Sequence, residues 1–148
     1  RASEFLMPME IKGRGGVDLH ENWGGDARAY LGISLPGFPN LFCLYGPNTN
    51  LIFNGSLVNF SECGAHYILE CIKTLLESWN KVMEIRREPF DDFNEKIDAE
   101  NKLMSWGASS VSSWYKNAFG RVSQNWPLPS LEYWRLTRKV RLEDYIFN

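Results

Sequence analysis

The sequence has few of the residues that metal sites and disulfide-rich proteins need. It contains two histidines, His20 and His66, and three cysteines without C-x-x-C spacing, so neither a metal centre nor a disulfide framework is indicated. His66 lies in a segment that is expected to form a long helix, and its ring should be packed or hydrogen-bonded there. Reduced, buried thiols are expected for all three cysteines: Cys43, Cys63 and Cys71.

Long apolar runs and targeting signals are also missing. No stretch reaches the roughly eighteen apolar residues that span a bilayer, and the first residues form neither a basic start nor an apolar signal core. A soluble, cytoplasmic protein without a membrane partner is therefore the expectation. The chain does not begin with Met, which suggests a fragment of a longer protein.

No glycine-rich phosphate cradle is present, because neither the P-loop pattern nor G-x-G-x-x-G occurs. Glycines gather only at Gly13, Gly15 and Gly16, where no strand of good length precedes them. A loop with a short hairpin is predicted for residues 1–22. The G-x-S-x-G elbow is absent as well, which disfavours a hydrolase with a Ser-His-Asp set.

The charge pattern excludes an obvious nucleic-acid footprint. The formal net charge is −2, and Lys and Arg are spread along the chain. One local basic cluster near the end is expected to be a solvated or interdomain face: Arg135, Arg138, Lys139 and Arg141.

The most informative stretch joins an apolar run, a turn and an amphipathic helix. Residues 41–45 predict a strand buried on both faces, which Pro47 ends, and apolar residues at three- and four-residue spacing predict a helix from Leu57 to Trp79. This order is typical of an α/β fold, in which ligands bind at the carboxyl end of a strand. A plain strand, turn and capped helix without a ligand is the common alternative.

The remaining pattern predicts weaker elements. A short strand is expected near residues 30–33 within an irregular Gly- and Pro-rich segment, and a half-exposed strand at residues 82–87. A helix should start near Pro89, with an apolar stripe formed by Phe90, Phe93, Ile97 and Met104. Few regular elements are expected in residues 105–148.

Aromatic residues are dense in that last segment. Without a positive groove, base stacking on single-stranded nucleic acid is disfavoured. Loops anchored by large side chains against a larger body are favoured instead. A non-catalytic interaction domain, whose exposed aromatics pack on a partner, is the alternative of another class.

Several motifs together carry a resemblance to a known family. The sequences RAYLGI (28–33), PGFPNLF (36–42) and YGPNTNL (45–51) are followed by SWYKNAFG (113–120), by Trp126-Pro127, and by YWR (133–135) and DYIF (144–147). In order and spacing these resemble the carboxyl-terminal part of class B flavoprotein monooxygenases, above all the Baeyer-Villiger type. The resemblance covers nearly the whole chain and is weakest at residues 82–102.

The resemblance implies a fold, an activity and cofactors. It implies an α/β fold that is the C-terminal part of an FAD/NAD(P)-binding, two-dinucleotide-binding-domain protein, with an irregular aromatic-rich end. Residues 1–80 would complete the FAD-binding domain, and residues 81–148 would pack on missing N-terminal nucleotide-binding domains. The parent enzyme would use FAD, NADPH and O₂ to oxygenate a ketone, or the N or S atom of a small organic substrate. The chain alone would be inactive.

The resemblance also implies site residues, none of them catalytic. The loop residues that would neighbour FAD are Pro47, Asn48, Thr49, Asn50 and Leu51, and Trp114 would lie close to the nicotinamide cofactor. Many relatives follow this loop with a Gly-His-Gly-Gly run, whereas this chain has Ile52, Phe53, Asn54 and Gly55. This departure leaves the substrate preference open.

Overall fold

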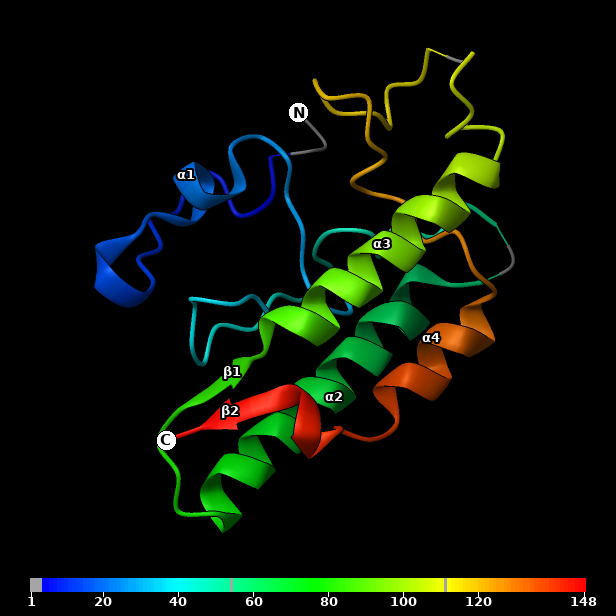
Figure 1. Ribbon diagram of the computed structural model, residues 1–148. Helices are drawn as coiled ribbons and strands as arrows, with labels where there is room; N and C mark the ends of the chain where they lie inside the picture. The colour runs from blue at the N-terminus through cyan, green and yellow to red at the C-terminus, as the bar shows by residue number, and fades with distance from the viewer. Residues whose placement is uncertain (1–3, 54, 111) are drawn as a thin grey trace.

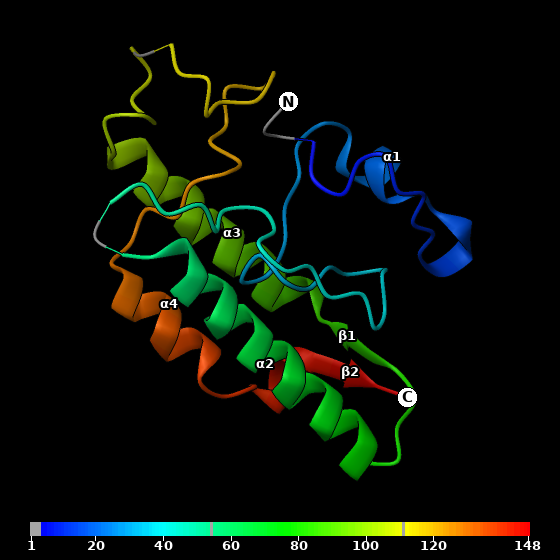
Figure 2. The same cartoon turned by 180° about the vertical axis from the view of Figure 1, so that it is seen from behind.

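Three helices lie side by side and form the body of the protein in a computed structural model (Figure 1). They are α2 (Leu57–Glu77), α3 (Arg87–Leu103) and α4 (Ser130–Thr137), and α2 packs directly against α4. The view from behind shows that the amino-terminal segment with α1 (Leu19–Trp23) lies to one side of these helices (Figure 2). The structure describes residues 4–53, 55–110 and 112–148.

Helix α2 confirms the predicted amphipathic helix. The side chain of Ser56 caps its start by accepting a hydrogen bond from the Val58 amide at 3.2 Å. The helix ends before Trp79, which has a φ of 58° and is 94% exposed, so the last position of the predicted stripe is wrong. The buried face consists of Phe60, Cys63, Gly64, Tyr67 and Cys71.

Helix α3 confirms the predicted start near Pro89, because it begins two residues earlier, at Arg87. A proline is tolerated in the first turn, where its missing amide has no intrahelical acceptor. Phe90 and Ile97 are buried as expected, whereas Met104 lies beyond the end of the helix.

A small antiparallel sheet closes one end of the helices. Strand β1 (Met83–Ile85) pairs with β2 (Tyr145–Phe147), and Met83 lies opposite Phe147. Strand β1 confirms the strand predicted at residues 82–87. Strand β2 and helix α4 lie in the segment that was expected to have few regular elements.

The buried strand predicted at residues 41–45 is wrong. The segment makes one ladder-like hydrogen bond, from the Cys43 amide to the Ile33 carbonyl at 2.8 Å, and Leu44 and Tyr45 are 52% and 44% exposed. Tyr45 has a φ of 56°, which is incompatible with extended backbone. An apolar run forms a strand only where a neighbouring strand satisfies its amides and carbonyls, and none lies beside this run among the described residues.

The short strand predicted at residues 30–33 is also wrong. The Tyr30 and Ser34 backbones exchange two hydrogen bonds, of 2.8 and 3.1 Å, across a tight turn. Leu31 and Gly32 both have positive φ values, 55° and 69°, which reverse the chain.

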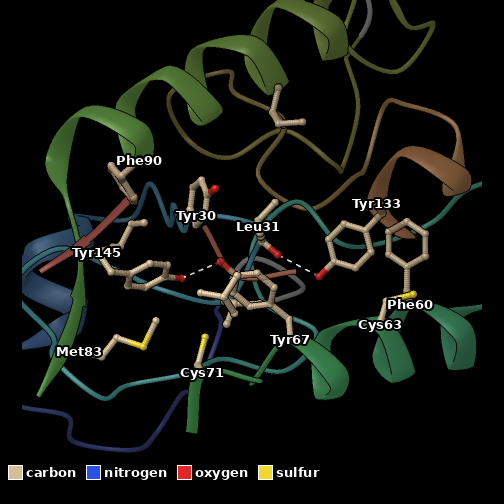
Figure 3. Packing of buried hydrophobic residues seen from close by; sticks show 14 of the residues in the cluster. Tyr30, Leu31, Phe60, Cys63, Tyr67, Cys71, Met83, Phe90, Tyr133 and Tyr145 are labelled. Atoms are coloured by element: carbon tan, nitrogen blue, oxygen red, sulfur yellow. Dashed lines mark hydrogen bonds between the residues drawn. The ribbon is translucent and has the colours of Figure 1, made fainter. Parts of the chain in front are cut away.

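The main core lies between the helices and the sheet and contains several tyrosines (Figure 3). The Tyr67 and Tyr145 hydroxyls lie 3.1 Å apart, and Tyr133 donates a hydrogen bond of 2.9 Å to the Leu31 carbonyl. Burial raises the pKa of Tyr67, Tyr133 and Tyr145, which therefore stay neutral. Residues from both sides of position 80 contribute to this core, and the division into 1–80 and 81–148 stays a prediction.

A second, smaller core holds the amino-terminal segment. The predicted hairpin is confirmed by a bridge between Lys12 and Asp18, and the Asp18 side chain also caps the short helix α1. The single-turn 3₁₀ helix η1 (Arg14–Gly16) forms the hairpin's tip. The residues buried in this core are Leu19, Trp23, Ala27, Ala29, Leu35, Phe38 and Cys43.

The cysteines, His66 and the basic cluster near the end of the chain were also subjects of prediction. All three cysteines are buried and free, and the His66 ring lies 3.2 Å from the Arg138 carbonyl oxygen, so both predictions are confirmed. The basic cluster at residues 135–141 is exposed. Among the helices that the structure describes, none combines the length and hydropathy that a membrane-spanning helix needs.

Candidate functional site

The loop at residues 46–51 is held in place by its own polar side chains. Asn48 Nδ2 donates to the Val122 and Asn125 carbonyls at 2.8 and 3.1 Å, and Thr49 Oγ1 donates to the Gly46 carbonyl at 2.7 Å. Both Asn48 and Thr49 are almost completely buried. These groups therefore fix the backbone of the loop, and they do not point into solvent.

The loop backbone pairs in parallel with the segment at residues 122–126. The Asn48 and Asn50 amides donate to the Ser123 and Gln124 carbonyls at 3.0 and 2.8 Å, and the Trp126 amide donates to the Asn50 carbonyl at 2.8 Å. The side chains of Asn50 and Asn125 also meet, with Nδ2 of Asn50 2.9 Å from Oδ1 of Asn125. Two segments more than seventy residues apart thus define one rigid loop.

Close packing of two glycines fixes the loop against the turn at residues 30–34. A Cβ atom on Gly32 would come within 2.2 Å of the Thr49 side chain, and one on Gly46 would come within 2.2 Å of the Gly32 carbonyl oxygen. Only glycine lets these backbones approach so closely. The sequence motifs at 28–33 and 45–51 therefore meet in space.

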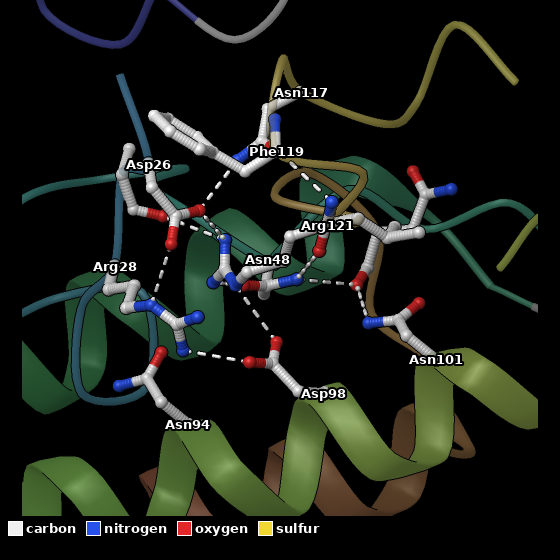
Figure 4. Close-up of polar contacts among 12 residues, drawn as sticks. Asp26, Arg28, Asn48, Asn94, Asp98, Asn101, Asn117, Phe119 and Arg121 are labelled. Atoms are coloured by element: carbon white, nitrogen blue, oxygen red, sulfur yellow. Dashed lines mark hydrogen bonds and ion pairs between the residues drawn. The ribbon is translucent and has the colours of Figure 1, made fainter. Parts of the chain in front are cut away.

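A partly buried ionic network lies behind the loop (Figure 4). The Arg121 side chain, 9% exposed, donates from Nε to Asp98 at 2.9 Å, from Nη1 to Asp26 at 3.1 Å and from Nη2 to Asn48 Oδ1 at 2.9 Å. Arg28 donates to the same two carboxylates, at 2.8 Å to Asp98 and at 3.0 Å to Asp26. Two guanidinium groups thus face two carboxylates, and the network is formally neutral.

The surroundings shift the pKa values of the two guanidinium groups in opposite directions. Burial lowers the pKa of Arg121, although the Asp98 carboxylate acts in the other direction. Burial would also lower the pKa of Arg28, but the hydrogen bond and charge of Asp98 outweigh it and the pKa is raised. Guanidinium groups stay charged at physiological pH in either case, so the network keeps its ion pairs.

A cavity of about 240 Å³ opens beside this network. It is lined by charged and polar side chains and by the turn at residues 119–121. Its lining residues are Arg28, Asp98, Asn101, Lys102, Gly107, Phe119, Gly120, Arg121 and Val122.

Apolar side chains and a helix start lie next to the loop on its exposed side. Tyr45, Ile52 and Phe53 are 44%, 37% and 44% exposed, and α2 begins a few residues further on with an exposed Ser56. The free amides of a first helical turn favour anions and polar ring edges. Asn54 of the Ile52–Gly55 departure lies outside the described residues.

Two buried polar atoms near the loop have no hydrogen-bond partner among the described residues. They are Ser123 Oγ and Asn125 Nδ2, on side chains that are 1% and 0% exposed. Both belong to the segment that pairs with the loop. An unsatisfied buried group of this kind costs free energy.

The structure brings together five of the six residues that sequence reasoning selected. Pro47, Asn48, Thr49, Asn50 and Leu51 share one loop. Trp114 lies on the separate segment 113–120 and is 86% exposed, with its ring 5.8 Å from that of Tyr115. Their roles as cofactor neighbours stay predictions.

Sequence reasoning missed the residues that hold the loop. Arg121 and Asn125 belong to one segment, Asp98 lies on α3 and Asp26 in the amino-terminal segment, and no common motif joins them. The one signal in the sequence is Arg121 directly after the SWYKNAFG motif, and its partners become visible only in three dimensions. Within the described ranges, no group of three or more His, Cys, Asp or Glu side chains could hold a metal ion.

Known proteins similar to this chain are monooxygenases. An FAD-binding monooxygenase of Aspergillus niger is 34% identical over all of this chain and 25% of its own length. A Baeyer-Villiger monooxygenase of Pseudomonas aeruginosa is 32% identical over 91% of this chain and 26% of its own length. The chain thus spans about a quarter of the length of the curated relatives that it matches. No protein-family model matches it.

Solved structures agree with these relatives. The chain superimposes on a steroid monooxygenase bound to NADP with a TM-score of 0.76 and 28% identity, over 93% of this chain and 26% of that one. A cyclohexanone monooxygenase from Rhodococcus has a TM-score of 0.78 at 19% identity, over 95% of this chain and 26% of that one, and shows the fold alone. The predicted resemblance to class B flavoprotein monooxygenases is therefore confirmed.

Proposed function

We propose that this chain forms part of an FAD- and NADPH-dependent monooxygenase. Such an enzyme inserts one atom of O₂ into a ketone, as Baeyer-Villiger enzymes do, or adds it to the N or S atom of a small organic substrate. The observation that carries the proposal is the 34% identity with an FAD-binding monooxygenase over the whole of this chain. Chance similarity rarely extends over so many ordered motifs.

The residues around the loop fit one wall of a flavin site. Exposed Tyr45, Ile52 and Phe53 offer apolar surface to a flat ring system, and the start of α2 offers backbone amides to its polar edge. The unsatisfied Ser123 Oγ and Asn125 Nδ2 lie in the segment behind the loop. This sequence contains no glycine-rich loop that could bind the phosphates of a dinucleotide, so its residues fit only the flavin part of the cofactor.

Within this proposal, each loop residue has a structural task. FAD, when bound, would supply the redox chemistry that couples NADPH oxidation to oxygen transfer. Leu51 would bound the wall, whereas the Pro47 side chain is fully buried, and Asn48, Thr49 and Asn50 keep the backbone in place through contacts inside the protein. Exposed Trp114 would contact the nicotinamide cofactor from its own segment.

The domain organisation belongs to the same proposal. Residues 1–80 would complete an FAD-binding domain, and residues 81–148 would pack on nucleotide-binding domains encoded elsewhere in a longer gene. Both cradles for dinucleotide phosphates would then come from that part, and the chain alone would be inactive. The quarter-length match to the relatives supports this division of tasks.

The test uses the natural-length protein, meaning this chain together with any sequence its gene encodes beyond it. We expect the purified protein to be yellow, with flavin absorbance, and to oxidise NADPH faster when a ketone, amine or sulfide substrate is added. A colourless protein that oxidises no NADPH with any of these substrates would contradict the proposal.

Exposed aromatic side chains favour a second candidate function, a non-catalytic interaction domain. Trp79, Trp114 and Phe119 are 94%, 86% and 69% exposed, so their rings are available to a partner protein. The two candidates differ in flavin content. A natural-length protein that binds no flavin but captures a partner protein through these three side chains would favour the interaction domain.

A further inference from the structure

Arg121 connects three parts of the chain that are distant in sequence. Its guanidinium donates to Asp98 on α3, to Asp26 and the Ala27 carbonyl in the amino-terminal segment, and to Asn48 in the loop at residues 46–51. All four contacts lie between 2.9 and 3.1 Å, and the side chain is almost completely buried. No other described contact joins α3 and the amino-terminal segment to the loop through one side chain.

The loop needs such support because its backbone is unusual at the point of contact. Asn48 has a φ of 59°, in the left-handed region, where a residue other than glycine is strained unless its surroundings hold it. Its side chain is bonded at both ends, since Oδ1 accepts from Arg121 while Nδ2 donates to the Val122 and Asn125 carbonyls. Removing the Arg121 contact would therefore free one end of the side chain that holds the turn.

Arg28 provides a natural comparison within the same network. It pairs with the same two carboxylates, Asp98 and Asp26, at similar distances. Among the described residues, its side-chain hydrogen bonds go to these two carboxylates and not to the loop. Any effect that depends only on the ion pairs should therefore appear for both arginines, and an effect on the loop only for Arg121.

We propose that Arg121 is a positioning residue that sets the loop at residues 46–51 in the place required for flavin binding. This inference rests on the proposed function. The planar guanidinium fork matches the task, because it presents several donors in fixed directions, whereas a lysine ammonium is a single point charge on a flexible stem. Replacement by Lys keeps the charge that faces Asp98 and Asp26 but loses the simultaneous contact with Asn48.

The experiment compares R121K with R28K in the natural-length protein. Flavin affinity is measured by fluorescence titration of the apoprotein, the environment of the bound flavin by its absorbance spectrum, and stability by the thermal midpoint. We expect R121K to raise the flavin Kd at least tenfold and to shift the spectrum. R28K should raise the Kd less than twofold, although its thermal midpoint falls by an amount similar to that of R121K.

A second variant keeps the test decisive if R121K does not fold. N48A removes the loop end of the contact and leaves Arg121 with both carboxylates. We expect it to raise the flavin Kd at least tenfold, and the R121K/N48A double variant, where it folds, to show less than the product of the two single effects. Unchanged flavin affinity in N48A would overturn the inference.

The outcomes separate this inference from the proposed function. A wild-type protein without flavin contradicts the proposed function itself. A wild-type protein that binds flavin, together with equal Kd values for R121K and R28K, overturns the positioning role and leaves the proposed function intact. A selective loss in R121K supports both.

Discussion

At the scale of single residues, the loop contains polar groups that depend on one another. Asn50 donates to the buried side chain of Asn125, which is 0% exposed, and accepts a hydrogen bond of 2.7 Å from the Tyr45 hydroxyl. Asn50 thus supplies the donor for Asn125 Oδ1, on a side chain that water cannot reach. A substitution here removes the partner of a group that stays buried, which costs more than the substitution of an exposed residue.

The variant N50L tests this dependence. We expect a loss of about 1 to 3 kcal/mol of stability, because Asn125 Oδ1 loses its donor, and weaker retention of FAD by the natural-length protein. Thermal unfolding and the flavin content after gel filtration measure the two effects. N59L, the same substitution at an exposed position of α2, is the control and should change neither. Unchanged flavin content and spectrum in N50L would remove its proposed role.

The buried thiols predict how stability depends on pH. Burial raises the pKa of Cys43 to about 11 and that of Cys71 to about 12, from an ordinary value of 9.0. Below pH 9 both thiols are neutral in the folded and the unfolded chain, and their contribution to stability is fully present. Between pH 9 and 11 only the unfolded chain ionises, so stability falls as the pH rises, by about 1 kcal/mol per thiol at pH 10.

Thermal midpoints at pH 8, 9 and 10 measure this loss. We expect a steady decrease above pH 9 in the natural-length protein. C71A should show a shallower decrease, because one of the two thiols is gone. A midpoint that is constant from pH 8 to pH 10 would contradict the raised pKa values.

At the scale of elements, the two long helices α2 and α3 could be predicted, whereas α1, α4 and most of the strands could not. The three- and four-residue spacing of buried residues in α2 depends only on the helix itself, and Pro89 with its acidic neighbours marks the start of α3. A strand depends on a partner, and the apolar run at residues 41–45 has no partner strand in the part of the chain that the structure describes. Strand β2 could not be predicted, because its partner strand β1 lies about sixty residues earlier in the sequence.

The residues of the candidate site also divide into those that the sequence could predict and those that it could not. The loop at residues 46–51 could be selected because its motif is continuous in sequence. Arg121 and its partners could not, since Asp98, Asp26 and Asn48 come from segments that lie far from Arg121 in the sequence. The sequence thus predicts a loop that contacts a cofactor, a role that stays a prediction, and the structure shows which residues hold that loop.

The packing of this turn against the loop can be tested with G32A. Its Cβ would meet the Thr49 side chain at 2.2 Å and the Pro47 carbonyl at 2.9 Å, at a φ of 69° that disfavours alanine. We expect a loss of about 2 to 5 kcal/mol, from overpacking together with backbone strain. The control is G37A, where φ is 84° but no atom lies within 4 Å, so that about 1 to 2 kcal/mol of strain is the whole cost. Equal falls in the thermal midpoint would show that close packing is unimportant.

At the scale of the whole molecule, two kinds of tryptophan occur. Trp126 is 1% exposed and packs against Phe60, Phe93 and Tyr133 in the main core. Trp114 is 86% exposed, and its one recorded ring contact is with the adjacent Tyr115. A tryptophan ring this exposed is available for the cofactor contact proposed above.

The variant W114A tests what that contact is. We expect it to raise the KM for NADPH at least fivefold in the natural-length protein, since the side chain is proposed to touch the nicotinamide cofactor. Its thermal midpoint should change little, because no buried surface is lost. W126A is the matched control, and it should lose about 3 to 5 kcal/mol of stability through the cavity left in the core. Steady-state kinetics and thermal unfolding measure both variants. Loss of folding in W114A with an unchanged KM for NADPH would assign Trp114 a structural role instead.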